Sequence, residues 1–264
     1  MALMTTDSNI FIVLAVRFCT AMRFLTLIPI SWRAEEDPQE FSKCLLFFAV
    51  VGMLIGGIGA SGIFLLSKIF PQPVVIAVGL AYLAFISGCL HLDGLSDSAD
   101  GLLSSRPKED CLKIMKDSRA GAMGIVVVVL VLLTKYAALS AMPKETLLPA
   151  FFLMPLAGRC AIVLTMASLP YARKEGGLGL LFYSDDSKKS AAIAFLFLFS
   201  FVVFLALGQL LPILVGVLSV NFLFNRWCKA KLGGATGDTL GAVCELTEMI
   251  VAVSLTSSIP LISQ

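Results

Sequence analysis

Long apolar stretches follow one another along the chain, separated by short polar segments. A helix that crosses the hydrocarbon core of a bilayer needs about 20 mostly apolar residues. The clear candidates are residues 44–66, 74–91, 122–142, 149–169, 191–207, 209–226 and 242–262. A weaker stretch, residues 9–30, contains Arg17 and Arg23, and it either spans the membrane or lies along its interface. The pattern predicts an all-α, polytopic membrane bundle with about seven or eight spanning helices.

Composition strengthens this interpretation and excludes several others. The residues A, V, I, L, M, F, W, Y and C account for 58% of the 264 positions, and charged residues for 14%. Soluble domains average roughly 45–50% apolar residues with glycine included, and about 25% charged residues. No polar linker divides the chain, so we expect one integral membrane domain over residues 1–264. The cysteines are scattered without a C-x-x-C pair, and no basic run suggests nucleic acid as a partner.

The loops differ sharply in charge. If all eight stretches cross the membrane, the loops on one side carry only two basic residues, Lys68 and Lys144. The loops on the other side carry Arg33, Lys43, Arg106, Lys108, Lys113, Lys116, Arg119, Arg173, Lys174, Lys188, Lys189, Arg226, Lys229 and Lys231. The positive-inside rule makes the basic side cytoplasmic. We therefore expect a multi-pass protein of the cytoplasmic (inner) membrane, surrounded by the lipid bilayer, with its active site facing the cytoplasm.

An acidic motif, residues 91–101 (HLDGLSDSADG), directly follows an apolar stretch. Asp93, Asp97 and Asp100 stand at i, i+4 and i+7, within about 60° on a helix. Like charges so close repel, and a Mg²⁺ ion, which takes carboxylate and phosphate oxygens, would remove the conflict. The alternative is an ordinary solvated helix start. His91, the only histidine, is either a general base or an interfacial side chain.

A second motif, residues 117–124 (DSRAGAMG), precedes the longest β-branched run of the chain. An arginine beside the N–H groups of a helix start is suited to hold a phosphate. Asp117, Ser118, Arg119 and Gly121 are therefore candidate substrate-binding residues. The alternative is a helix cap followed by small residues for packing.

A third motif, residues 233–241 (GGATGDTLG), leads into Glu245 and Glu248. Glycines let the backbone approach a ligand, and threonine hydroxyls and Asp238 offer oxygen atoms. Glu245 lies about two turns into the last apolar stretch, where a carboxylate marks a candidate functional site. Arg159, halfway along its own stretch, is the expected partner of Glu245, in a pair that is either functional or structural.

Two further segments carry weaker signals. Residues 171–179 (YARKEGGLG) form a basic loop that is either a substrate lid or an ordinary cytoplasmic loop. Residues 57–62 (GIGASG) match the dinucleotide fingerprint G-x-G-x-x-G, but they lie inside an apolar stretch with no strand before them. With Gly52 and Gly56 they are better explained by close helix packing.

The motifs resemble those of the cobalamin synthase family over nearly the whole chain and in the same order. The resemblance rests on residues 91–101, 114–119 (IMKDSR), 171–173 (YAR) and 233–242. Residues 24–29 (FLTLIP) are also similar to the opening of that family. The family usually has arginine where Leu27 stands, and Arg23, one helical turn earlier, is the candidate replacement.

This resemblance implies a step of vitamin B12 assembly. The family, the adenosylcobinamide-GDP ribazoletransferases, joins α-ribazole or α-ribazole 5′-phosphate to adenosylcobinamide-GDP in the cytoplasmic membrane. The ribose 3′-hydroxyl attacks the cobinamide-side phosphorus and GMP leaves, with a divalent metal, normally Mg²⁺, as cofactor. The product is adenosylcobalamin or its 5′-phosphate.

The motifs and the resemblance together assign roles to individual residues. The expected metal ligands are Asp93, Asp97 and Asp100. The expected catalytic residues are His91, Asp100, Arg119 and Asp238. The expected substrate-binding residues are Asp117, Ser118, Arg119, Gly121, Arg159, Arg173, Gly234, Thr236, Gly237 and Glu245. Within this set we expect Arg119 to hold the GDP moiety, and Asp238 and Glu245 to assist the metal or orient the attacking hydroxyl.

Two other functions compete with this interpretation. A lipid enzyme of the CDP-alcohol phosphotransferase type also uses aspartates at the membrane edge, but its usual Ala-Arg does not follow Asp97 here. A cation-coupled transporter would use Lys135, Arg159 and Glu245 as buried charges, but such proteins commonly show internal repeats, and none is visible. A homo-oligomer remains open.

Overall fold

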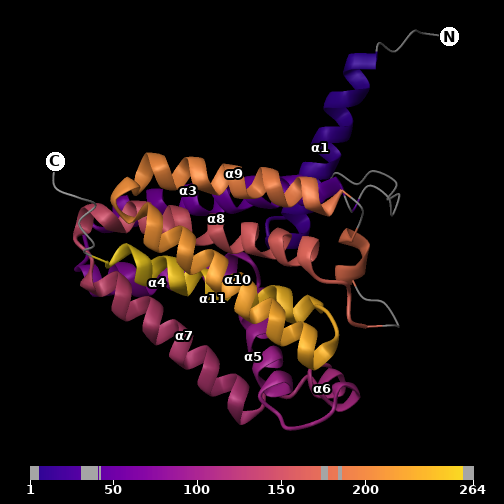
Figure 1. The fold of residues 1–264 in the computed structure, drawn as a ribbon. Coiled ribbons are helices and arrows are strands. Elements are labelled where there is room, and N and C mark those ends of the chain that lie inside the picture. Colours follow the sequence, from indigo (N-terminus) through magenta and orange to yellow (C-terminus); the bar gives the residue numbers. More distant parts are fainter. Residues whose placement is uncertain (1–5, 31–40, 42, 174–177, 184–185, 258–264) are drawn as a thin grey trace.

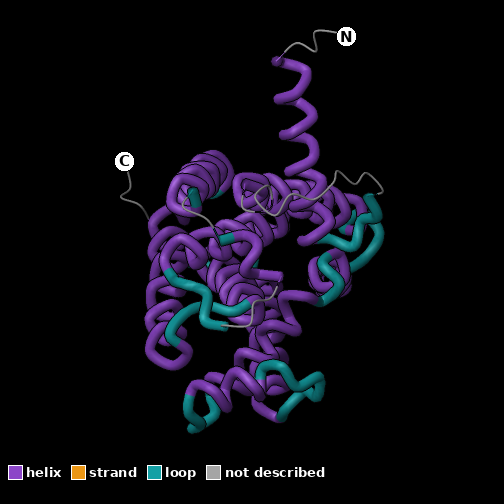
Figure 2. The backbone as a smooth tube through the Cα atoms, turned by 90° about the vertical axis from the view of Figure 1, so that its right-hand side faces the viewer, coloured by secondary structure: helices purple, strands orange, loops and turns teal. Residues whose placement is uncertain are grey.

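The computed structural model describes residues 6–30, 41, 43–173, 178–183 and 186–257, and it is helical apart from loops (Figures 1 and 2). The long helices are α1 (Thr6–Leu25), α3 (Phe48–Leu66), α4 (Gln72–Ile86), α5 (Leu90–Leu102), α7 (Ala122–Ala141), α8 (Lys144–Ser168), α9 (Ser187–Leu205), α10 (Leu210–Leu232) and α11 (Gly237–Leu255). The short ones are η1 (Cys44–Phe47), α6 (Lys108–Ile114), η2 (Leu178–Phe182) and η3 (Leu207–Gln209). The prediction of an all-α membrane bundle is confirmed.

Fewer helices than expected are long and apolar enough to cross a membrane. Within the described residues, five meet that description: Cys44–Leu66, Ala122–Ala141, Lys144–Ser168, Ser187–Leu205 and Leu207–Leu232. A sixth is possible if α4 and α5, bent by 84°, form one broken span. Helix α11 is not among them because it carries three charged residues, Asp238, Glu245 and Glu248. Residues 258–262 of the predicted last span lie outside the described residues.

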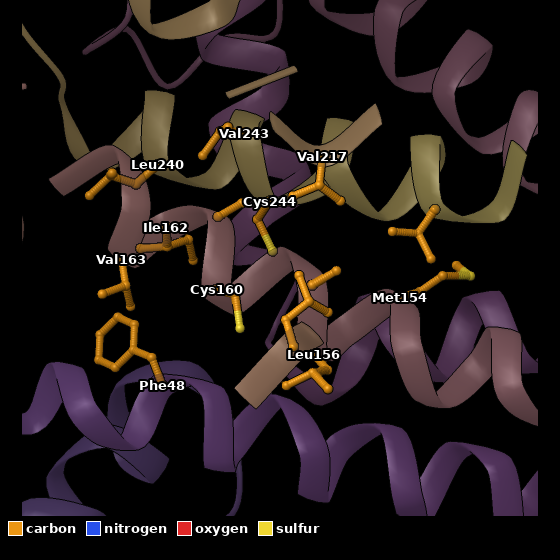
Figure 3. Close-up of a cluster of buried hydrophobic side chains, with 14 of the residues drawn as sticks. Phe48, Met154, Leu156, Cys160, Ile162, Val163, Val217, Leu240, Val243 and Cys244 are labelled. Atoms are coloured by element: carbon orange, nitrogen blue, oxygen red, sulfur yellow. The ribbon is translucent and has the colours of Figure 1, made fainter. Parts of the chain in front are cut away.

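Helix α8 occupies the middle of the bundle. It packs against α3 on one side and α11 on another (Figure 1), and most of its side chains are buried. Figure 3 shows Leu156, Cys160 and Ile162 of α8 between Phe48 at the start of α3 and Cys244 of α11. Because α8 is enclosed by protein, it can carry a charged residue, Arg159, at mid-length if the neighbouring helices provide the counter-charge.

Two glycines allow α3 and α8 to approach closely. A methyl group added to Gly52 would lie 2.7 Å from the carbonyl oxygen of Pro155, and one added to Gly56 would clash with Phe152. The packing explanation is confirmed for these two, and for Gly59, which lies against Tyr82. It is wrong for Gly57 and Gly62, which have no atom within 4 Å of an added methyl, because they lie on the outer side of α3.

A sharp bend separates the apolar helix α4 from the acidic helix α5. The sequence pattern treats residues 74–91 as one span, but α4 ends at Ile86. Gly88 and Cys89 then adopt left-handed backbone angles, with φ of 61° and 58°. A left-handed conformation is uncommon for a residue other than glycine, and two in succession turn the chain. The bend lays α5 along α11 instead of continuing in the direction of α4.

The polar motifs meet at one end of the bundle, on the right in Figure 1. The amide of Ala172 donates to the carbonyl of Ala235 at 2.8 Å, and the amide of Ala235 donates to Pro170 at 2.9 Å. Gly234 has no room for a side chain because it touches the Pro170 carbonyl. The third motif and the fourth, up to Arg173, therefore lie together. The second motif joins α5 at the same end through the hydrogen bond from the Gly121 amide to Asp100. Arg33 and residues 174–177 of the basic loop lie outside the described residues.

The two faces of α3 give a matched test of this packing. Gly52→Ala should lower the stability by about 1–3 kcal/mol, because its methyl overlaps the α8 backbone. Gly57→Ala, on the open face, should be neutral or slightly stabilising, because alanine favours a helix over glycine. Thermal unfolding midpoints in one detergent measure both. Equal midpoints for the two variants would contradict the α3–α8 contact.

Candidate functional site

The acidic helix α5 and helix α11 touch at a pair of glycines. A methyl group added to Gly94 would lie 2.7 Å from the Asp238 carbonyl oxygen, and one added to Gly241 would lie 3.1 Å from the His91 carbonyl oxygen. Only hydrogen fits at these points, so the two backbones run nearly in contact. This contact brings Asp93 and Asp97 of α5 beside Asp238 of α11, as the sequence analysis expected of the first and third motifs.

Helices α5 and α11, with residues of α1, of α8 and of the segment after α8, enclose a cavity of about 220 Å³, called here the acidic cavity. Its lining residues are Phe24, Leu90, His91, Asp93, Gly94, Ile162, Tyr171, Arg173, Gly237, Asp238, Leu240 and Gly241. Of the predicted site residues, it brings together His91, Asp93, Arg173, Gly237 and Asp238. The His91 side chain is buried, and its Nε2 has no hydrogen-bond partner.

Asp238 is held in place from two directions. The guanidinium of Arg173 donates to Asp238 Oδ2 at 2.6 Å, and the Thr236 hydroxyl donates to the same oxygen at 3.3 Å. Thr236 also caps α11 by accepting from the amide of Thr239, whose hydroxyl accepts from the Thr236 amide in return. Burial raises the pKa of the Asp238 carboxyl, and the adjacent Arg173 limits that rise.

The pKa of Asp97 is affected by the neighbouring carboxylates. Partial burial, followed by the negative charges of Asp93, Asp238 and Asp100, raises the pKa of Asp97 to about 7. A bound cation would relieve like-charge repulsion of this kind. The donor chemistry of Asp93, Asp97 and Asp238, all carboxylate oxygens, suits Mg²⁺.

Asp100, the third predicted metal ligand, is turned away from this group. Its carboxylate accepts from the amides of Gly121 and Gly124 at 2.8 and 2.9 Å, and so caps the start of α7. Among the described residues, no three His, Cys, Asp or Glu side chains are arranged to hold a metal by themselves. The carboxylates therefore fit a Mg²⁺ ion only if phosphate oxygens or water complete its shell, which is the usual way of binding this ion.

The second motif does not reach the acidic cavity. Arg119 forms a two-pronged pair with Asp117, with Nε–Oδ1 at 3.0 Å and Nη2–Oδ2 at 2.7 Å, and its side chain is 87% exposed. This pair lowers the pKa of Asp117 to about 2. Ser118 is exposed as well, whereas Gly121 meets Asp100. The motif thus joins α5 to α7 through Gly121 and presents Arg119 to solvent.

A second, basic cavity of about 350 Å³ adjoins the acidic one. Its lining residues are Lys108, Glu109, Leu112, Lys113, Lys116, Ala172 and Arg173. Arg173 lines both cavities and therefore stands between them. The sequence analysis counted the three lysines only as cytoplasmic loop charges. Lys108 and Lys113 lie on the short helix α6 and Lys116 lies just beyond it, but no local pattern places them around one cavity with Ala172 and Arg173.

Arg159 and Glu245 lie deep in the bundle, away from both cavity linings. Arg159 pairs with Glu248 at 2.6 Å, whereas Glu245 pairs with Lys135 of α7 at 2.6 Å. Lys135 also contacts Glu248 at 2.8 Å, and all four side chains are at most 8% exposed. The expected direct Arg159–Glu245 pair is therefore wrong, because Glu248, one turn further along α11, takes Arg159. We call these four residues the buried ion network.

Comparison with known proteins agrees with these features. The family model for cobalamin-5-phosphate synthase matches residues 17–256. The chain belongs to the cobalamin-5-phosphate synthase family. Among its curated relatives, an adenosylcobinamide-GDP ribazoletransferase of Clostridium acetobutylicum is 36% identical over 88% of this chain and 92% of the relative. Another, of Geotalea daltonii, is 38% identical over 90% of this chain and 96% of the relative. No solved structure matches the chain.

Family membership covers both cavities and the buried ion network. The matched residues 17–256 run from the middle of α1 almost to the end of the described chain. The sequence-based identification of the cobalamin synthase family is therefore confirmed. The residue roles proposed for this member rest on its own structure.

Asp97 and Asp100 should respond differently to substitution. Asp100→Asn loses one of two amide contacts and should lower stability by about 1–3 kcal/mol. Asp97→Asn should not lower it, because the change removes repulsion. A carboxyl with a raised pKa contributes to stability while protonated, and that contribution is lost as the pH rises toward and through about 7.

The measurement is the unfolding midpoint at pH 5 and pH 8, with a chelator present. The wild-type midpoint should fall between these values by more than that of Asp97→Asn. An identical pH dependence in the two proteins would contradict the carboxylate cluster.

The buried ion network gives a second stability test. Lys135→Met leaves Glu245 buried without its cation and should cost about 3–5 kcal/mol. Lys135→Met combined with Glu245→Gln should recover part of this loss, because the uncompensated charge is gone. Unfolding midpoints of the single and double variants decide the matter. A double variant less stable than Lys135→Met would refute the pairing.

Proposed function

We propose that this chain is an adenosylcobinamide-GDP ribazoletransferase. In this reaction the 3′-hydroxyl of α-ribazole or α-ribazole 5′-phosphate attacks the cobinamide-side phosphorus of adenosylcobinamide-GDP. A new P–O bond forms, the bond to the bridging oxygen breaks, and GMP leaves. Support comes from relatives of that name that align over about nine-tenths of the chain.

The observation that carries the proposal is the position of Arg173 between two cavities of opposite character. A diphosphate that joins two large groups needs one place for the reacting phosphorus and one for the leaving nucleotide. The acidic cavity offers carboxylates for a metal and a buried histidine beside them. The basic cavity offers Lys108, Lys113 and Lys116 to the phosphate charge that stays with GMP. Arg173 would contact the diphosphate where the two halves separate.

Polar residues in and beside the acidic cavity then have distinct tasks. Asp93, Asp97 and Asp238 would hold Mg²⁺, which when bound neutralises phosphate charge. His91 Nε2, which has no partner, would accept the proton of the attacking hydroxyl. Arg173 forms its contact with Asp238 from one guanidinium nitrogen, which leaves its other N–H groups for phosphate oxygens. Gly237, at the start of α11, lets a ligand approach the backbone closely.

This proposal changes several of the sequence-based assignments. Asp100 acts by positioning α7 rather than by binding the metal. The GDP moiety, first assigned to Arg119, is placed in the basic cavity, because Arg119 is already paired with Asp117 at the surface. Arg159 and Glu245 hold α8, α7 and α11 together from within the buried ion network.

We further propose that the site faces the cytoplasm from the inner membrane. The support is the concentration of basic loop residues at the end of the bundle where the motifs meet.

The decisive experiment uses purified protein in lipid with adenosylcobinamide-GDP, α-ribazole and Mg²⁺, and follows the release of GMP. GMP should appear only when all three are present, and a chelator should abolish it. Absence of GMP release from well-folded protein under these conditions would refute the proposed activity.

Two variants then separate the cavities. Arg173→Lys keeps the charge but loses the planar fork, so kcat/KM should fall by an amount equivalent to about 1.5–3 kcal/mol. Lys108→Gln should chiefly raise KM for adenosylcobinamide-GDP, because Lys108 lines only the basic cavity. Lys188→Gln, an exposed charge at the start of α9, is the control. A larger effect of Lys188→Gln than of Lys108→Gln would contradict the nucleotide assignment.

A further inference from the structure

A groove of about 390 Å³ runs along the outside of the bundle between α8 and α10, and it shares no lining residue with either cavity. Its lining residues are Leu164, Ser168, Leu169, Leu218, Asn221, Phe222, Asn225, Arg226 and Lys229. The side chains change in character along α10, from apolar through amide to basic toward its end. Leu218 and Phe222 are 46% and 67% exposed on a helix apolar enough to span a membrane.

The middle of this groove contains an unused hydrogen-bond donor. The Thr165 hydroxyl lies 3.1 Å from Asn221 Oδ1 and 3.0 Å from Asn225 Oδ1, so its single proton is shared between the two amide oxygens. Asn221 is only 6% exposed, yet its Nδ2 has no partner. A buried donor without an acceptor costs free energy, and an oxygen atom of a ligand in the groove would satisfy it.

The spacing of these groups matches the length of a lipid. Arg226 stands five residues beyond Asn221, about 7.5 Å along the helix, and Lys229 stands eleven beyond Leu218, about 16 Å. A phosphate beside Arg226 and Lys229 would place ester oxygens near Asn221 and an acyl chain along Phe222 and Leu218. Basic pockets at the cytoplasmic ends of membrane helices are suited to anionic headgroups.

We propose that this groove binds one anionic phospholipid, with its phosphate on Arg226 and Lys229 and its ester region on Asn221. A second copy of the chain fits the groove poorly. A two-fold dimer would bring the same basic end of both copies together, and like charges there repel.

The bound lipid would steady the end of the helix that precedes the third motif. Helix α10 ends at Leu232, and Gly233, with a φ of 77°, turns the chain into the segment that ends with Thr236 and Asp238. The groove therefore adjoins the helix that positions one wall of the acidic cavity, without sharing a residue with that cavity.

The test is native mass spectrometry of the purified protein in detergent, with palmitoyl-oleoyl phosphatidylglycerol or phosphatidylcholine added. The wild type should retain one phosphatidylglycerol with roughly tenfold or greater preference over phosphatidylcholine, as two basic contacts imply. Arg226→Gln combined with Lys229→Gln should lose this preference. Leu218→Trp, which fills the apolar part while leaving the charges, should weaken the binding of both lipids.

The matched control is Lys188→Gln combined with Lys189→Gln, which removes the same charge from α9 at the same end of the bundle. It should bind phosphatidylglycerol like the wild type. An equal loss in the control would show that the lipid follows overall charge and would overturn the proposal. Equal binding of the two lipids by the wild type would also overturn the proposal, as would an unchanged preference in the Arg226/Lys229 variant. A lipid-free dimer of the wild type that the Leu218→Trp variant abolishes would overturn it as well.

Discussion

The structure depends on one constraint: helix α11 carries carboxylates through the middle of a membrane bundle, and each needs a positive partner. An unpaired charge in such surroundings is far more costly than one in water. Asp238, Glu245 and Glu248 stand at i, i+7 and i+10, on one side of the helix. Three different elements meet them, since Arg173 follows α8, Lys135 belongs to α7 and Arg159 to α8. These pairings fix how α7, α8 and α11 are placed against one another, and the cavities follow from that placement.

Much of this arrangement is visible in the sequence, but the partner choices are not. Apolar length predicted the helical membrane bundle, and the expectation that Asp238 assists a metal on Asp93 implied that the two residues lie close together. The position of Arg159 inside an apolar stretch predicted a buried ion pair. However, Glu245 and Glu248 are nearly one turn apart on the same helix side, so the helical period cannot say which of them faces α8. That choice depends on the contact of α8 with α11, where a methyl group added to Gly158 would lie 3.0 Å from Glu248 Cγ, and no local pattern reveals this contact.

The same limit explains the acidic motif. A spacing of i, i+4 and i+7 places Asp93, Asp97 and Asp100 on one side of α5, but a helix side within 60° can still face two neighbours. The bend at Cys89 lays α5 between α11 and the start of α7, so that Asp93 faces α11 while Asp100 meets the free amides of α7. Cys89 is not a residue type that predicts a left-handed turn. The sequence therefore predicts the carboxylate cluster but not which neighbouring helix each aspartate faces.

The charges along α11 are balanced around Glu245 and Glu248 but not around Asp238. In the buried ion network two cations meet two carboxylates, so the group is neutral and needs no ligand. Beside the acidic cavity one cation, Arg173, faces the carboxylates of Asp93, Asp97 and Asp238, and partial burial together with their repulsion raises the pKa of Asp97. Gly94 and Gly241 keep the two helices together despite that repulsion, by backbone contact that no side-chain charge can alter. The charges of α11 are therefore balanced within the buried ion network and left unbalanced at the end that carries Asp238.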